Sequence, residues 1–206
     1  MNYPNFNEEN KLKKQGYKLV AGLDEAGRGP LAGPVVASVV LVKELKDKKM
    51  FLGIRDSKKL SQKQREQYYE LLTTSKDIQW AVGIVSEKVI DKINILEATK
   101  LAMNKAIDDL NTKVDHLILD GNFKINSDIK QKSVIKGDNK VFSCCAAGII
   151  AKVTRDRMMQ KYHKKYPDYG FNTHKGYGTK FHIQKIGELG PCKIHRKTFY
   201  PVSRFV

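Results

Sequence analysis

The sequence predicts an α/β protein, in which a mixed five-stranded sheet is flanked by helices and followed by a small C-terminal helical region. Three observations support this class. Short apolar, β-branched stretches precede or alternate with longer stretches of helical periodicity. The first two apolar stretches are joined by a short glycine-rich link, which favours an antiparallel pair. A helix between the third and fourth strands permits a crossover, so that the fourth strand can lie beside the first and parallel to it.

The first strand is expected over residues 17–24, where it delivers the adjacent carboxylates Asp24 and Glu25. In a strict strand these two side chains would point to opposite faces, so the pleat is expected to end there. The glycines and prolines of Gly27–Pro34 then supply the turn. Residues 35–42 are apolar and β-branched throughout, as in a central strand.

The remaining elements follow from periodicity and capping residues. Residues 1–16 form a basic lead-in, loosely ordered or helical, and residues 43–49 a charged loop. Helices are expected at 61–73, 86–92, 95–110, 141–163 and 180–189, and further strands at 79–85, 116–121 and 133–136. Residues 1–206 are expected to fold as a single domain, with 166–206 as an extension rich in glycine, aromatic and basic residues.

The charge indicates a polyanionic partner. The chain has 38 lysines and arginines against 22 aspartates and glutamates, a formal net charge of +16. On charge alone DNA, RNA and an acidic membrane surface all stay open. No apolar run approaches the roughly 20 residues of a membrane span, and the N-terminus lacks the pattern of a secretory signal. The expected localisation is therefore cytoplasmic, with the three cysteines reduced.

Four carboxylates fall at strand ends or directly before a helix: Asp24, Glu25, Asp120 and Asp138. A mixed sheet can bring such positions to one edge, where ionised carboxylates repel one another unless cations are present. Hard oxygen ligands select Mg²⁺ or Mn²⁺ over zinc. Two such ions about 4 Å apart can activate a water and neutralise the leaving oxygen in phosphodiester hydrolysis.

Motifs across most of the chain resemble those of ribonuclease HII, the bacterial type 2 ribonuclease H. They are Gly22–Pro34, Asp56–Ser61, Ile93–Leu96 with Ala98 and Thr99, Leu119–Asn122, Lys136–Asp138, Ile150–Asp156, His174–Tyr177 and His195–Phe199. The resemblance implies a ribonuclease H-like fold and assigns the metal ligands to Asp24, Glu25, Asp120 and Asp138. It implies a metal-dependent endoribonuclease that hydrolyses the RNA strand of RNA/DNA hybrids. It also implies nicking 5′ of single ribonucleotides in duplex DNA, leaving 3′-hydroxyl and 5′-phosphate ends, and a role in ribonucleotide removal.

The same resemblance implies a set of substrate contacts. They are Gly27, Arg28, Gly29, Ser57, Lys58 and Tyr177, with His174 and Lys152 as further candidates. Backbone groups of the Gly27–Gly29 turn, together with Arg28, would contact the 2′-hydroxyl and the adjacent phosphate, because glycine permits a close approach. Tyr177 would lie on the sugar at the RNA-to-DNA junction. The chain departs from the family pattern at Gly148, where a serine is expected, and this departure is expected to affect packing alone.

The sequence also bears on two other classes of protein. A non-catalytic nucleic-acid binder is disfavoured because a binder gains nothing from carboxylates that repel phosphates. A dinucleotide-binding domain is excluded because Pro30 and Gly33 do not complete the fingerprint that begins at Gly27. Arg155 and Arg157 are assigned either to a basic helix face against the duplex or to a solvated face, and Asp156 to an intrahelical ion pair. The protein is expected to act as a monomer.

Overall fold

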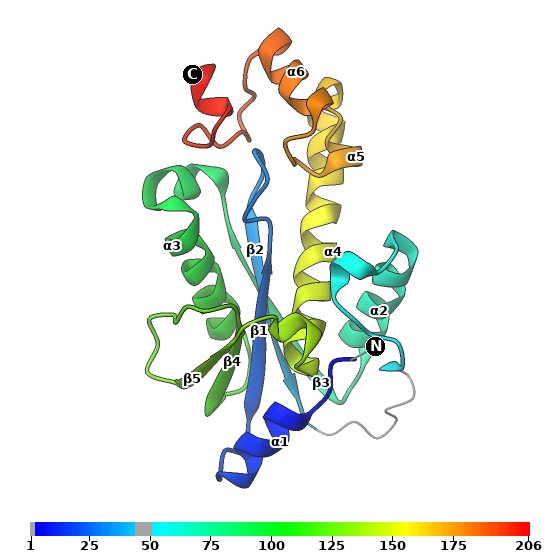
Figure 1. The fold of residues 1–206 in the computed structure, drawn as a ribbon, viewed down its shortest axis with the longest axis vertical. Coiled ribbons are helices and arrows are strands. Elements are labelled where there is room, and N and C mark those ends of the chain that lie inside the picture. The colour runs from blue at the N-terminus through cyan, green and yellow to red at the C-terminus, as the bar shows by residue number, and fades with distance from the viewer. Residues whose placement is uncertain (1–2, 44–50) are drawn as a thin grey trace.

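A computed structural model describes residues 3–43 and 51–206, with one sheet between helices (Figure 1). The expected loop at 43–49 lies, apart from Lys43, outside these residues. The strands are β1 (Val20–Ala26), β2 (Val35–Val42), β3 (Ile78–Val85), β4 (His116–Asp120) and β5 (Lys130–Val134). The helices are α1 (Asn7–Lys14), α2 (Gln62–Thr74), α3 (Glu87–Asp108), α4 (Phe142–Lys165), α5 (Phe171–His174) and α6 (Lys180–Leu189). Short 3₁₀ turns include η2 (Ser57–Lys59) and η3 (Gly137–Asn139).

The sheet has five strands in the order β3-β2-β1-β4-β5. β1 pairs antiparallel with β2 and parallel with β4, while β2 pairs antiparallel with β3 and β4 parallel with β5. The predicted fold class, the antiparallel first pair and the parallel crossover neighbour are therefore confirmed. None of the helices in the described parts of the chain is both long enough and apolar enough to span a membrane.

β1 extends beyond its predicted C-terminal end at residue 24, to Ala26. The prediction that the pleat ends at Asp24 is wrong, because Asp24 and Glu25 remain in register with Ser38 and Ala37 of β2. The turn begins instead at Gly27, whose φ of 101° lies in the region that favours glycine. The two carboxylates are thus held by a regular ladder, which fixes them more firmly than a loop would.

Two other boundaries differ from expectation. β5 lies at 130–134 and not at 133–136, because it is a polar edge strand without the apolar alternation that reveals buried strands. The helices expected at 86–92 and 95–110 are joined in α3, but the expected break is present at Asn94, where φ is 65°. The Asn94 side chain accepts the N–H groups of Leu96 and Glu97, at 2.9 and 3.2 Å, and so caps the second segment.

The N-terminal lead-in is helical over α1 and reaches the core. Glu9 is 3% exposed, and its carboxylate accepts hydrogen bonds from the backbone N–H and the hydroxyl of Ser143, at 3.0 and 2.8 Å. Ser143 lies in the first turn of α4, where backbone N–H groups lack intrahelical partners and a carboxylate is favourable. α1 therefore fixes the start of the longest helix.

The helices α3 and α4 pack on opposite faces of the sheet, and Figure 1 shows them on either side of β1 and β2. α4 approaches β1 at backbone contact, because a Cβ atom on Gly22 would lie 2.4 Å from the carbonyl carbon of Ser143 and 2.5 Å from the nitrogen of Cys144. This close approach brings the start of α4, and the turn η3 before it, against the strand that carries Asp24.

We expect Gly22→Ala to lower the free energy of unfolding by about 1–3 kcal/mol, because the added methyl group would overlap backbone atoms of α4 that cannot rotate away. Urea denaturation measures this change. Gly187→Ala in α6 is the matched control, since its nearest neighbour atom would be 3.8 Å away. That control should be neutral or stabilising by up to about 1 kcal/mol. Equal destabilisation by the two substitutions would contradict the packing argument.

Candidate active site

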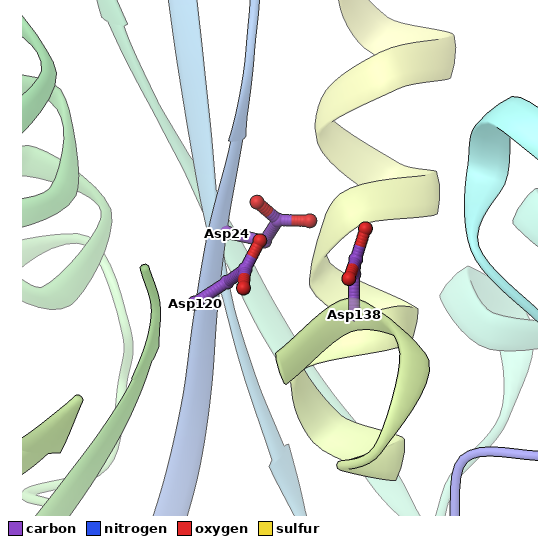
Figure 2. Close-up of side chains that lie close together, drawn as sticks. All are labelled: Asp24, Asp120 and Asp138. Carbon is purple, nitrogen blue, oxygen red and sulfur yellow. The ribbon is translucent and has the colours of Figure 1, made fainter. Parts of the chain in front are cut away.

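Three aspartates from three different elements converge at one edge of the sheet (Figure 2). Asp24 lies in β1, Asp120 ends β4 and Asp138 lies in η3, and one carboxylate oxygen from each is within 4.8 Å of the others. The parallel pairing of β1 with β4 sets Asp24 beside Asp120. Asp120 accepts the N–H of Gly137 at 2.7 Å, which fixes η3 and thereby Asp138. The structure thus brings together three of the four carboxylates that the sequence singled out.

Glu25 stands apart from this group of three. One oxygen of its carboxylate lies 3.2 Å from a guanidinium nitrogen of Arg28. The other oxygen is buried and has no hydrogen-bond partner in residues 3–43 and 51–206. The backbone N–H of Glu25 donates to Asp24 at 2.7 Å, so the two acids are linked through the main chain. A buried carboxylate oxygen without a partner, on the residue next to Asp24 in the strand, is suited to bind a cation.

The electrostatics of the cluster also favour a cation. Burial, and then the charges of Glu25 and Asp120, raise the pKa of Asp24 well above its usual value. Burial and the charge of Asp138 likewise raise the pKa of Asp120. The positive charge of Lys58 offsets part of this repulsion between carboxylates, since its Nζ lies 3.8 Å from Oδ2 of Asp138. Divalent cations would relieve this repulsion, and an all-oxygen donor set fits Mg²⁺ or Mn²⁺.

Gly148 borders the cluster directly. A Cβ atom at this position of α4 would lie 2.2 Å from Oδ2 of Asp24. The missing side chain leaves the space that a candidate ligand oxygen occupies. That this departure from the family pattern affects packing alone stays a prediction.

The Gly27–Gly29 turn and Tyr177 lie side by side, although they are far apart in the sequence. Gly27 is buried, while Arg28 and Gly29 are exposed. A Cβ atom on Gly29 would lie 3.8 Å from the Tyr177 ring, which is itself 44% exposed. Arg28 also contacts Glu25, which is next to Asp24 in β1, so the turn adjoins the part of the strand that contributes to the acid cluster.

Lys152 and His174 lie near Tyr177. The Nζ of Lys152 is 5.9 Å from the centre of the Tyr177 ring and donates to Asp156 at 2.8 Å, so Asp156 is in the intrahelical ion pair that was expected. Burial lowers the pKa of Lys152. Both ring nitrogens of His174 are engaged, with Nε2 2.7 Å from the carbonyl oxygen of Tyr169 and Nδ1 accepting the N–H of Gly176 at 3.1 Å.

Ser57 and Lys58 lie in η2 on the other side of the cluster. The buried carboxylate of Asp56 accepts the N–H of Lys58 at 2.9 Å and so shapes this turn, while the carbonyl of Ser57 accepts from Arg65. A cavity of about 850 Å³ extends from Asp120 and Asp138 along this side. Its basic lining residues are Arg55, Lys58, Lys59, Lys136 and Lys140. An acidic centre thus adjoins a basic groove.

Two buried arginines were not anticipated. Arg155, predicted to lie on an exposed helix face, is 1% exposed, and Arg196 is 0% exposed. Both donate to backbone carbonyls of the segment that follows β1. The helical spacing of Ala151, Arg155 and Met159, all buried, is the signal that places Arg155 on the inner face of α4.

This sheet order, with aspartates from its two central parallel strands beside a basic groove, defines a nuclease of the ribonuclease H fold. The structure is similar to the crystal structure of the ribonuclease H2 from Pyrococcus horikoshii OT3, with a TM-score of 0.75, 29% identity and coverage of 91% of this chain and 96% of that one. The predicted fold is thereby confirmed.

The family model described as Ribonuclease HII matches residues 21–202. The Ribonuclease HII of Chlamydia muridarum is 52% identical over 96% of this chain and 89% of its own length. That of Bacillus subtilis is 51% identical over 96% of this chain and 75% of its own length. The chain belongs to the ribonuclease HII family. It is accordingly an enzyme, a ribonuclease H that hydrolyses phosphodiester bonds as an endoribonuclease.

Proposed function

We propose that the protein nicks duplex DNA on the 5′ side of single embedded ribonucleotides, hydrolyses the RNA strand of RNA/DNA hybrids, and so removes ribonucleotides from DNA. The products carry 3′-hydroxyl and 5′-phosphate ends. The observation that carries this proposal is a chain of neighbours: Tyr177 lies beside Gly29, Arg28 bonds Glu25, and Glu25 follows Asp24 of the three-aspartate cluster in β1. Groups suited to a ribose therefore adjoin groups suited to phosphodiester hydrolysis.

In this proposal Asp24, Asp120 and Asp138, with Glu25, hold Mg²⁺ or Mn²⁺. When bound, such ions activate a water and neutralise the leaving oxygen. The chain's own residues supply the remaining requirements. The carboxylates are held by the β1–β4 ladder and by the Gly137 N–H, so their positions are set before substrate arrives. Lys58, beside Asp138, would donate a hydrogen bond to a phosphate oxygen of the substrate strand.

The 2′-hydroxyl is the group that distinguishes RNA from DNA, and it both donates and accepts hydrogen bonds. Arg28 and Gly29 are exposed, and the missing side chain of Gly29 leaves its peptide group open to a close approach. The Tyr177 ring beside them offers an apolar face for the neighbouring sugar. The turn thus reads the ribonucleotide, and the ring packs on the sugar at the junction.

The same proposal includes action as a monomer in the cytoplasm. All three clustered aspartates come from one chain, so no partner subunit is needed to complete the acid cluster. The net charge of +16 and the basic groove supply affinity for the duplex backbone without reading its sequence. Binding to any duplex should accordingly weaken as salt is raised.

The test uses three labelled duplexes of one sequence: all DNA, DNA with one ribonucleotide, and an RNA/DNA hybrid. Each is incubated with Mg²⁺, with Mn²⁺ and with a chelator. We expect a metal-dependent nick 5′ of the single ribonucleotide, cleavage of the hybrid, and no cleavage of all-DNA duplex. Cleavage of the hybrid alone would contradict the proposed recognition of single ribonucleotides. Tight, salt-sensitive binding without any cleavage would favour the non-catalytic binder.

Tyr177→Ala is expected to lower the rate of cleavage at single ribonucleotides about tenfold, the equivalent of losing one ring contact of about 1–3 kcal/mol. Duplex affinity should fall less, because most of it comes from backbone charge. Tyr177→Phe keeps the ring and is the matched control. Single-turnover rates and dissociation constants measure the two effects separately. An unchanged rate in Tyr177→Ala would contradict the role assigned to the ring.

A further inference from the structure

Arg196 is enclosed by the carbonyl groups of the segment that leaves β1. Its guanidinium donates to four of them: Gly27 at 2.6 Å, Arg28 at 3.0 Å, Gly33 at 3.0 Å and Pro34 at 3.2 Å. Nη1 and Nη2, the two arms of the guanidinium fork, bond the carbonyls of Arg28 and Gly27 respectively. One rigid planar group therefore fixes two successive peptide units.

No carboxylate lies within ion-pair distance of Arg196 in the described part of the chain. The ring of Phe199 covers its guanidinium at 5.0 Å, and Arg155 is a second buried cation that bonds the carbonyls of Ala32 and Pro34. A buried charge without a counter-ion is costly, so its partners must be held firmly. Burial lowers the pKa of Arg196 to about 9, which leaves the guanidinium charged at neutral pH.

The direction of the carbonyls sets the direction of the amides. All described peptide bonds other than Tyr200–Pro201 are trans. In a trans peptide the C=O of one residue and the N–H of the next lie in one plane and point in opposite directions. Since the Gly27 and Arg28 carbonyls point inward to Arg196, the N–H groups of Arg28 and Gly29 point outward.

These two N–H groups are open to a ligand. Arg28 and Gly29 are both exposed, and neither backbone N–H donates to an acceptor anywhere in residues 3–43 and 51–206. Successive N–H groups that point the same way form a concavity that binds oxygen atoms of anions. The buried charge of Arg196, on the carbonyl side of the same two peptide groups, adds positive potential at the turn.

We propose that Arg196 is a positioning residue for ribonucleotide recognition: it holds the two peptide groups of the Gly27–Gly29 turn so that their N–H groups face the 2′-oxygen and the adjacent phosphate. The proposal rests on the proposed function, in which this turn reads the ribose. Arg196 touches no substrate, since it is 0% exposed. It acts by preventing either peptide plane from flipping, which would present a carbonyl to the phosphate.

The test is the ratio of two affinities, for duplex with one ribonucleotide and for all-DNA duplex of the same sequence, measured in Ca²⁺. Arg196→Lys keeps the charge but cannot span two carbonyls, so we expect this ratio to fall about tenfold, the equivalent of one lost hydrogen bond to a charged group. Affinity for all-DNA duplex should change less than about twofold, since lysine keeps the positive charge and the other basic residues that bind the DNA phosphates are unaltered. Arg155→Lys is the control matched for burial, and it should keep the ratio because Arg155 bonds neither the Gly27 nor the Arg28 carbonyl.

A parallel loss of both affinities in Arg196→Lys, or an unchanged ratio, would overturn the positioning role. If Arg196→Lys does not fold, amide NMR of the unaltered protein serves instead. The ¹H–¹⁵N signals of Arg28 and Gly29 should shift on addition of the ribonucleotide duplex and much less with all-DNA duplex, and equal shifts would count against the proposal. If the unaltered protein does not distinguish the two duplexes, the proposed function has failed and not this inference alone.

Discussion

Asp24→Asn is expected to lower the cleavage rate about a thousandfold or more, because several kcal/mol of charge stabilisation depend on the cations that this carboxylate helps to hold. Asp24 is buried at the centre of the cluster, and neutral asparagine has the same shape without the charge. Duplex affinity should stay within about twofold, since it comes from basic residues elsewhere. Single-turnover cleavage and equilibrium binding measure the two quantities.

Thermal melting adds a readout that does not depend on activity. Saturating Mn²⁺ should raise the melting temperature of the unaltered protein, because a ligand that binds only the folded state stabilises it. It should not raise that of Asp24→Asn. Without metal, Asp24→Asn should melt no lower than the unaltered protein, since the substitution removes repulsion from Asp120. Asp108→Asn, at an exposed position, is the control. More than a tenth of the normal rate in Asp24→Asn would contradict the ligand assignment.

Acid is expected to destabilise the protein by several kcal/mol through a buried pair of histidines, His182 and His195. Nδ1 of His195 lies 2.9 Å from the backbone nitrogen and 3.3 Å from the carbonyl oxygen of Cys192. We assign the proton of His195 to Nε2, because the shorter of these contacts is the one in which Nδ1 accepts. In that tautomer Nε2–H of His195 donates to Nε2 of His182 at 3.0 Å, and Nδ1–H of His182 donates to the carbonyl oxygen of Tyr177 at 2.8 Å. Both rings are therefore neutral, and together they hold the backbone of Tyr177.

Burial lowers the pKa of His182 and of His195 to about 4, from an ordinary value of 6.5. Between pH 6.5 and 4 the unfolded chain thus binds more protons than the folded one. Stability is fully present above pH 6.5 and falls as the pH is lowered, by up to about 3 kcal/mol for each ring. Urea denaturation at pH 4, 5, 6 and 7 measures this slope.

His182→Gln removes one of the titrating rings and should flatten the slope of stability against pH relative to the unaltered protein. Other groups also contribute to the slope: burial lowers the pKa of His116 and His174, and the raised pKa of Asp120 acts in the opposite direction. Both proteins contain these groups, so the difference between their slopes reports the histidine pair. Equal slopes for the two proteins would show that the pair does not titrate on unfolding.

The convergence of Asp24 with Asp120 could be predicted because parallel neighbours end at the same edge of a sheet, and both residues follow apolar strands. Asp138 followed from its place just before a helix. The strand β5 was misplaced because its side chains are polar and partly exposed, so no apolar period marks it.

The environment of the turn could not be predicted from the pattern of charge. Arg196 and Arg155 are buried by contacts with backbone carbonyl groups. Every residue, glycine and proline included, carries the same carbonyl group, so nothing in the sequence singles out the ones that bond these arginines. The ion pair of Glu25 with Arg28 likewise depends on the direction of a turn. Such contacts are set by backbone geometry, which side-chain periodicity does not encode.

The parallel ladder between β1 and β4 also bears on the kinetics of folding. The N–H of Lys18 bonds the Asp115 carboxylate across a separation of 97 residues at the base of this ladder. Contacts so distant in the chain form slowly, because the entropy of closing a long loop is lost first. The aspartates therefore meet only when this ladder has formed. A divalent cation bound between them should slow unfolding of the protein and leave its rate of folding nearly unchanged.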